Sequence, residues 1–350
     1  MTVRTRLGTV AAAVAMLLTT VGVGPATATG PPVQVRVTIG EACVYANKPS
    51  GDLVKLTLRT GSGHFLGTEE DATSSTSFLA CFTHRVRIGY RINIVDGDDT
   101  RTTGVPDLTI GADRITDVVS GHGPASKHIL VKYGDCSLTG CAGYTELDGT
   151  VDSHGRWHRD LTSRIDLQGA DRLAAEYTNS RGDTFGTQEE HVPYLQLSKP
   201  NKVHIECQPD RAVNVTLKTA GGTLRVSRSF PMAGDCATPD ATFRRNGAAV
   251  NIAVGNIIRS DLASDAKVIW PHVAVSWSGQ AVAVRCLPGE PFDIKVLRAA
   301  IPQFELAGTT DSTGRYANLA TGFPALAGDE LNLTCATAKG DRIMFTDTVP

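Results

Sequence analysis

The sequence predicts an all-β chain of tandem β-sandwich domains in a duplicated A-B-A-B arrangement, and three observations support this. Short runs of alternating apolar residues are broken by Gly, Asp, Asn and Pro every 8–12 residues or so, which is typical of sandwiches. No stretch after residue 28 keeps a period of 3.6, so helices are not expected. A nine-residue motif occurs twice, 159 residues apart, at 149–157 (GTVDSHGRW) and 308–316 (GTTDSTGRY).

Each copy of this motif predicts two strands joined by a tight turn. Asp152 and Asp311 are expected to open the turn by accepting backbone N–H groups. Gly155 and Gly314 are expected to close it, because glycine readily adopts positive φ. The aromatic residue two positions after each glycine then points inward by strand alternation.

The duplication extends over nearly all of the chain after the N-terminal segment. Four further matches follow: 53–58 with 212–217, 89–94 with 247–252, Asp171 and Leu173 with Asp329 and Leu331, and 181–183 (RGD) with 339–341 (KGD). The motif and these matches together predict four units of some 70–95 residues, each the size of a small sandwich. The predicted units are A1 (33–124), B1 (125–193), A2 (200–276) and B2 (277–350), with a junction at 197–200.

The first 28 residues predict a signal peptide. Arg4 and Arg6 precede an apolar run at 10–23, and an Ala-Thr-Ala cleavage site ends at Ala28. A membrane anchor is the alternative, but the run is short and interrupted by polar residues. We therefore expect a secreted, extracellular protein without membrane insertion. Loss of the two arginines leaves 32 basic and 36 acidic residues, a formal charge of −4 without a basic block, which argues against a nucleic-acid partner.

The cysteines predict disulfide bonds, because all eight follow the signal peptide and an even number is typical of exported proteins. The repeat suggests Cys43–Cys81 and Cys207–Cys236, and the remaining cysteines pair most simply as Cys136–Cys141 and Cys286–Cys335. Zinc binding is the alternative, but the chain has no C-x-x-C pair.

At the repeated motif the residues 152–157 and 311–316 resemble the T-D-x-x-G-x-Y hairpin of immunoglobulin-like and carboxypeptidase-regulatory-like (transthyretin-type) β-sandwich modules. The composition after the signal peptide is similar to that of secreted proteins from high-GC actinobacteria. The resemblance implies tandem immunoglobulin-like sandwiches and supplies no active site. The cysteine-tryptophan-cysteine arrangement of antibody domains is absent.

Three local patterns are candidates for binding. His154 and His158 lie beside aspartates as metal ligands would, but the other copy has Thr and Ala at these positions. The acidic loop 96–99 offers oxygen ligands for calcium, although we interpret it as a solvated turn. The RGD tripeptide is known from adhesion ligands, but its KGD copy at the same place in the repeat predicts a hairpin turn.

The sequence contains no nucleophile elbow, zinc-binding helix motif or phosphate-binding glycine loop. The three acidic residues 69–71 and the two at 189–190 are predicted to lie in polar connections, and Trp157 to lie in a core. Trp270 and Trp277 are expected to pack between units, with a sugar-binding platform as the alternative.

These patterns predict a non-enzymatic secreted protein with a binding or cell-envelope structural role. Its partner is an unknown protein or glycan at the cell surface, and no metal or cofactor is expected. The alternative is a secreted hydrolase, perhaps glycan-acting, whose carboxylates come from distant strands.

Overall fold

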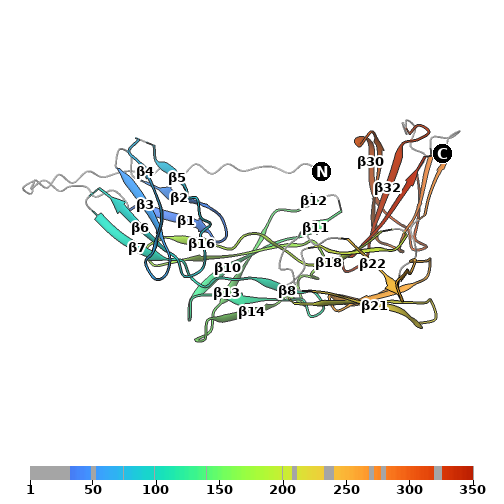
Figure 1. Cartoon of the computed structure of the whole chain (residues 1–350), viewed down its shortest axis with the longest axis horizontal. Coiled ribbons are helices and arrows are strands. Elements are labelled where there is room, and N and C mark those ends of the chain that lie inside the picture. The colour runs from blue at the N-terminus through green and yellow to red at the C-terminus, as the bar shows by residue number, and fades with distance from the viewer. Residues whose placement is uncertain are drawn as a thin grey trace, which may run out of the picture.

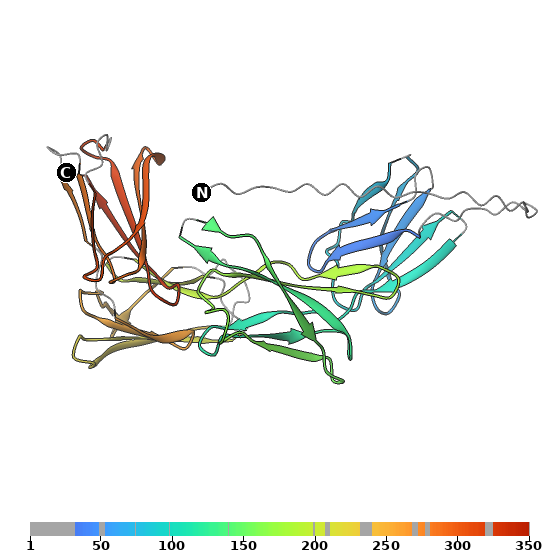
Figure 2. The ribbon, with the colours of Figure 1, turned by 180° about the vertical axis from the view of Figure 1, so that it is seen from behind.

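The computed structural model describes residues 32–48, 53–73, 75–97, 99–138, 140–198, 200–206, 211–231, 240–267, 272–276, 281–318 and 325–349. All regular structure in these ranges is β-strand, which confirms the predicted all-β class. The body is elongated, with A1 at one end, B1 in the middle, and A2 and B2 at the other end (Figure 1, and from behind in Figure 2). The predicted signal peptide lies outside the described residues.

Each A unit packs two sheets against each other. In A1 one sheet contains β1 (Gln34–Thr38), β2 (Cys43–Asn47) and β5 (Ser77–Cys81), and the other β3 (Val54–Arg59), β4 (Phe65–Asp71), β6 (Arg91–Asp96) and β7 (Asp99–Gly104). In A2 the corresponding strands are β18 (Tyr194–Ser198), β19 (Lys202–Glu206) and β22 (Ala241–Thr242), facing β20 (Val213–Lys218), β21 (Leu224–Phe230), β25 (Ile257–Ser260) and β26 (Ala263–Lys267). Alternation explains the packing, because Val54, Leu56 and Leu58 of β3 are fully buried while the residues between them lie on the other face.

Each B unit is also built from two sheets. B1 contains β10 (His128–Gly134), β13 (Thr145–Thr150), β15 (Arg172–Thr178), β16 (Thr184–Gly186) and β17 (Glu190–His191), facing β8 (Gly111–Asp113), β9 (Val118–His122) and β14 (Arg156–Asp160). B2 contains β29 (Pro291–Arg298), β30 (Ile301–Thr309), β32 (Glu330–Ala336) and β33 (Arg342–Thr348), facing β27 (His272–Ser276), β28 (Ala281–Arg285) and β31 (Arg315–Asn318). Two small hairpins complete the described strands: β11 (Cys136–Ser137) with β12 (Gly140–Cys141), and β23 (Arg244–Arg245) with β24 (Ala248–Ala249).

The sheet of each B unit continues into the sheet of its A unit. Strand β16 pairs in parallel with β1, and β33 pairs in parallel with β18. Backbone hydrogen bonds therefore join the two units of each half. The four-unit division stays a prediction, and strand pairing crosses its boundaries. Strands β8 and β9 precede residue 125 but share a sheet with β14, β18 precedes residue 200 but pairs with β19, and β27 precedes residue 277 but pairs with β28. Below, a residue is assigned to the unit whose sheets its strands join, so that Arg114, between β8 and β9, counts with B1.

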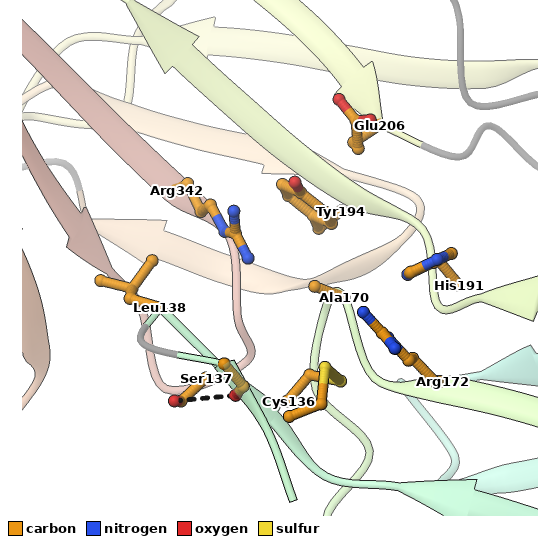
Figure 3. A pocket seen from close by; sticks show the side chains of 11 residues that line it. Cys136, Ser137, Leu138, Ala170, Arg172, His191, Tyr194, Glu206 and Arg342 are labelled. Carbon is orange, nitrogen blue, oxygen red and sulfur yellow. Dashed lines mark hydrogen bonds between the residues drawn. A yellow bond between two sulfur atoms is a disulfide. The ribbon is translucent and has the colours of Figure 1, made fainter. Parts of the chain in front are cut away.

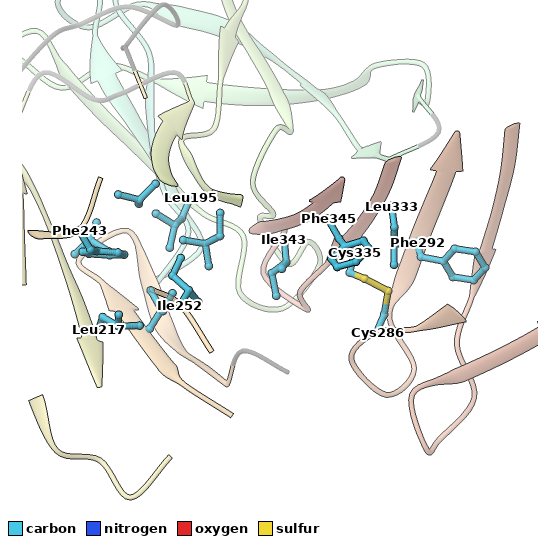
Figure 4. Packing of buried hydrophobic residues seen from close by; sticks show 14 of the residues in the cluster. Leu195, Leu217, Phe243, Ile252, Cys286, Phe292, Leu333, Cys335, Ile343 and Phe345 are labelled. Atoms are coloured by element: carbon cyan, nitrogen blue, oxygen red, sulfur yellow. A yellow bond between two sulfur atoms is a disulfide. The ribbon is translucent and has the colours of Figure 1, made fainter. Parts of the chain in front are cut away.

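Among the described residues, three clusters of buried apolar side chains form the cores. One fills A1 and takes in Phe185 from β16 of B1, and a second fills B1. The third runs without interruption through A2 and B2, from Leu217 and Phe243 to Phe292 (Figure 4). Shared apolar burial therefore strengthens the joins that the parallel strand pairs make.

Three cysteine pairs lie at disulfide distance, and they are three of the four predicted pairs. Cys43–Cys81 joins neighbouring residues of β2 and β5, and Cys136–Cys141 closes the β11–β12 hairpin. Cys286–Cys335 links the two sheets of B2 and lies in the buried cluster (Figure 4). The predicted pair Cys207–Cys236 lies outside the described residues.

In one place the strands that correspond in the two halves differ from those that the sequence match paired. Strand β3 pairs with β6, placing Leu58 opposite Ile92, and β20 pairs with β25, placing Leu217 opposite Ile258. The match of residues 89–94 to 247–252 is therefore wrong, because the second half inserts the β23–β24 hairpin before the strand that corresponds to β6.

We expect the disulfides to contribute unequally to stability, because a cross-link that closes a longer loop removes more entropy from the unfolded chain. The sequence separations are 5 residues for Cys136–Cys141 and 49 for Cys286–Cys335. Replacing both cysteines by serine should lower the free energy of unfolding by about 2 kcal/mol in the first case and about 4 kcal/mol in the second. Denaturant unfolding checks this, and equal losses would contradict it.

Candidate functional site

The repeated motif forms the same turn in both copies. In B1 one carboxylate oxygen of Asp152 accepts the backbone N–H of His154 at 2.8 Å and of Arg156 at 2.9 Å. In B2 Asp311 accepts the N–H of Thr313 at 2.7 Å and of Arg315 at 3.0 Å. These backbone hydrogen bonds, first of all those from the two arginines, lower the pKa of both aspartates.

The predicted turn chemistry is therefore confirmed, and the carboxylates are occupied by the turn itself. Gly155 and Gly314 both have φ of 78°. Trp157 is 3% exposed and belongs to the B1 core, as predicted, while His154 and His158 are exposed. Within the described ranges no group of three or more His, Cys, Asp or Glu residues is placed to hold a metal ion.

The RGD tripeptide is a hairpin turn, as predicted, and its aspartate is not accessible. Asp183 is fully buried, while Arg181 is exposed. The carboxylate accepts both guanidinium N–H groups of Arg101 at 2.6 Å and the backbone N–H of Val35 in β1 at 3.2 Å. Burial by itself raises the pKa of Asp183, but these bonds and one from Asn179 outweigh it and hold the pKa below its usual value.

The KGD copy occupies the corresponding place in the second half. Asp341 is 4% exposed and accepts the backbone N–H of Leu195 in β18 at 2.8 Å. Its arginine, however, comes from the other half: Arg114 of B1 donates to Asp341 at 2.5 Å, to the carbonyl of Leu262 at 2.9 Å and to that of Lys339 at 2.5 Å. Arg114 is 2% exposed and therefore joins B1, A2 and B2 in one buried contact.

The backbones of the two halves also approach closely beside this arginine. The N–H of Gly169 donates to the carbonyl of Lys339 at 2.9 Å, and a Cβ on Gly340 would lie 2.3 Å from the nitrogen of Gly169. The ammonium of Lys339 pairs with Asp117 at 3.3 Å and with Asp166. We call this contact between the halves the clasp. The sequence gives one signal for it, since the aspartate recurs in both halves and a buried carboxylate is stabilised by a nearby cation.

A groove lies between the halves on another side of the junction. Its cavity of about 350 Å³ is lined by B1, A2 and B2 (Figure 3). The residues that line it are Cys136, Ser137, Leu138, Gly140, Cys141, Ala170, Arg172, His191, Tyr194, Glu206 and Arg342. Sequence reasoning missed this groove, because its side chains come from segments as far apart in the chain as Cys136 and Arg342.

Charged side chains lie on both walls of the groove. The guanidinium of Arg342 lies over the ring of Tyr194, 4.6 Å from its centroid. Burial raises the pKa of the Tyr194 hydroxyl, and the positive charge of Arg342 opposes that rise. On the B1 side, Arg172 lies 3.2 Å and His191 3.7 Å from the carboxylate of Glu189.

The structure places most of the acidic residues singled out in the sequence in strands, and two of them pair with lysines. Residues 69–71 are in strand β4 and Glu190 is in strand β17, so their placement in polar connections was wrong. Glu70 pairs with Lys55 at 3.5 Å, and Asp71 with Lys48 at 3.0 Å. Residue 98 of the candidate calcium loop lies outside the described residues, as do Trp270 and Trp277.

One duplicated carboxylate has opposite properties in the two copies. Burial raises the pKa of Asp171, although its oxygens accept the N–H groups of Cys136 and Gln168 and the hydroxyl of Tyr133. The counterpart Asp329 has a lowered pKa, because Arg298 donates to both of its oxygens at 3.0 Å. All of these oxygens have donors, which argues against a role for either residue as a general base.

A wider hollow of about 710 Å³ is lined by residues of β8, β9 and β14 and of the segments beside them. His122 and His158 line it, and His122 lies 3.2 Å from the exposed Asp107.

Among the described residues there is no helix with the length and hydropathy needed to cross a bilayer.

Comparison with known proteins places the chain in no family, since no family model and no curated protein matches it. Two solved structures can be aligned with 91% of the chain and 98% of their own length. One is a tetra-tandem repeat from the extending region of a large adhesion protein (11% identity, TM-score 0.20), and the other belongs to a 1.5-MDa bacterial ice-binding adhesin (10% identity, TM-score 0.20). Superpositions this loose carry no argument about function.

The repeated turn predicts a matched pair of mutational effects. Asp152→Ala and Asp311→Ala should each lower the stability, because each removes the acceptor of two backbone N–H groups, as in the loss of a helix cap. Gly314→Ala should cost more than Gly155→Ala, although both residues have the same φ. A Cβ at 314 would lie 2.5 Å from the carbonyl oxygen of Cys286, whereas at 155 the nearest atom would be 3.2 Å away. Chemical denaturation of the variants measures this, and equal costs for the two glycines would refute the packing argument.

The buried Asp183 predicts a dependence of stability on pH. Because its pKa is lowered on folding, the stability it contributes is present above the unfolded pKa of about 4 and is lost as the pH falls through the folded value. Asp183→Asn should therefore lower the Tm at pH 7 and reduce the further loss of Tm on acidification. Thermal unfolding at pH 7, 5 and 3 measures both effects. The exposed Asp347→Asn is the control for loss of one charge, and an unchanged acid slope in Asp183→Asn would contradict the assignment.

Proposed function

We propose that the chain is a secreted, extracellular, non-enzymatic β-sandwich protein with a binding or cell-envelope structural role. The observation that carries this proposal is the way in which the units are joined. Parallel strand pairs unite the units of each half, and the clasp around Arg114 unites the halves. An extended body joined in this way is suited to holding a surface away from its point of attachment.

The chemistry of the described residues supports the same role. Three disulfides suit an oxidising compartment. The duplicated aspartates at turns and junctions accept hydrogen bonds from backbone N–H groups and cations, so their charge serves the fold. A surface protein or glycan is the partner that we propose for such a body.

The clasp is expected to stiffen the junction between the halves. A body that holds a surface away from its point of attachment depends on this stiffness. Arg114→Met removes the cation of a buried pair and should cost about 3–5 kcal/mol, because Asp341 is left buried without compensation. Small-angle X-ray scattering should then show a broader distribution of interatomic distances, with the β-sheet circular dichroism retained. Arg298→Met is the matched control, since its partner Asp329 lies in the same unit. Identical scattering by native protein and Arg114→Met would contradict a stiffening role for the clasp.

The non-enzymatic assignment is tested separately. The purified mature protein should contain no stoichiometric metal and should turn over none of a panel of peptide, ester and glycan substrates. Fractionation of an exporting host should recover it from the medium or the cell wall. Turnover that disappears on replacing a single acid or histidine, with the fold intact, would instead establish the secreted hydrolase.

A further inference from the structure

The groove between the halves is walled by an element that only one copy possesses. In B1 the strands β10 and β13 are separated by the disulfide-closed β11–β12 hairpin. In B2 the corresponding strands β29 and β30 are joined directly at Ala299 and Ala300. The hairpin is therefore an addition to the repeated fold, and it forms one side of the groove (Figure 3).

The stacked pair on the opposite side is also specific to one copy. Val35 and Leu195 donate to the equivalent aspartates Asp183 and Asp341, which aligns β1 with β18. The strand registers then make Gln34 the counterpart of Tyr194, and Thr184 the counterpart of Arg342. The fold requires neither the arginine nor the tyrosine.

No carboxylate of the described residues pairs with the guanidinium of Arg342, whose contact is with the face of Tyr194. Arg101, Arg114 and Arg298, by contrast, each pair with a buried aspartate. A planar guanidinium with free N–H groups matches a carboxylate with two parallel hydrogen bonds.

The other polar groups of the groove suit the hydroxyl groups of a sugar. Glu206 supplies a carboxylate, oriented by a 2.9 Å contact with Nε2 of His204. Ser137 and Tyr194 add hydroxyl groups, and the disulfide and Leu138 form an apolar wall. A cavity of about 350 Å³ is at the small end of ligand sites and fits one or two sugar residues.

We propose that this groove binds an acidic saccharide, with Arg342 pairing with the carboxylate of the sugar. The inference rests on the proposed function, because it names the ligand class of a surface-binding protein. Because the lining comes from B1, A2 and B2, the bound sugar contacts both halves and holds them in the same arrangement as the clasp. Arg172 adds positive charge on the facing wall, partly offset by Glu189, and His191 adds a polar ring beside them.

The test is titration of the full mature chain with a disaccharide that contains glucuronate, followed by calorimetry or NMR shifts. The matched ligand is the neutral disaccharide with hydroxymethyl in place of the carboxylate. The acidic sugar should bind about tenfold or more tightly than the neutral one, as expected for loss of a bidentate ion pair. Arg342→Gln should remove this preference and Arg342→Lys should restore part of it. Arg36→Gln, which removes an equal charge from the exposed face of A1, should leave affinity within about twofold.

Three outcomes would overturn the inference: equal affinity for both disaccharides, no binding by the native chain, or an unaltered preference in Arg342→Gln. Tighter binding of a peptide with a free C-terminal carboxylate would also overturn it and assign the groove to peptide ends. Since the ligand comparison needs no variant, it decides the matter even if Arg342→Gln does not fold. Hydrolysis of the disaccharide would refute the non-enzymatic role while leaving the binding inference intact. If the native chain does not bind the disaccharide but Arg114→Met shows the broader distance distribution expected above, only this inference fails and the proposed function stands.

Discussion

A buried aspartate carboxylate that accepts the backbone N–H of a first strand is the contact on which the architecture depends. Asp183 makes this bond to β1 and Asp341 makes it to β18, in each case from the turn that leads into the last main strand of the half. A carboxylate loses its hydration when it is buried, and in both copies an arginine compensates for that loss beside the N–H donor. The strand that follows the turn is thereby held beside the first strand, where parallel pairing extends the sheet.

The cation differs between the copies, and this difference sets the shape of the molecule. Arg101 is supplied from within the first half, so that junction is complete by itself. Arg114 is supplied to Asp341 across the boundary between the halves. The same structural requirement thus closes one half and attaches the other to it. A duplicated chain with arginines only inside each half would lack this connection.

Duplication also leaves one copy free to depart from the pattern. Asp171 and Asp329 occupy the same place, yet burial among neutral donors raises the pKa of the first while Arg298 lowers that of the second. The groove follows the same principle, because its disulfide hairpin and its arginine-tyrosine stack have no counterpart in the other copy. A specific ligand site can arise from residues that the fold itself does not require.

Local sequence determined the strand class, the aspartate-glycine turns, the core position of Trp157 and three cysteine pairs that the structure brings together, because each depends on alternation, turn chemistry or the repeat. The sequence match at 247–252 was wrong, because the inserted β23–β24 hairpin displaces the repeat but leaves the alternation of apolar residues unchanged. Only the tertiary structure decided which arginine meets Asp341 and that Tyr194, Glu206 and Arg342 share a groove with the B1 hairpin. Those contacts join segments far apart in the chain, and side-chain partners across such distances are chosen by how the sheets pack.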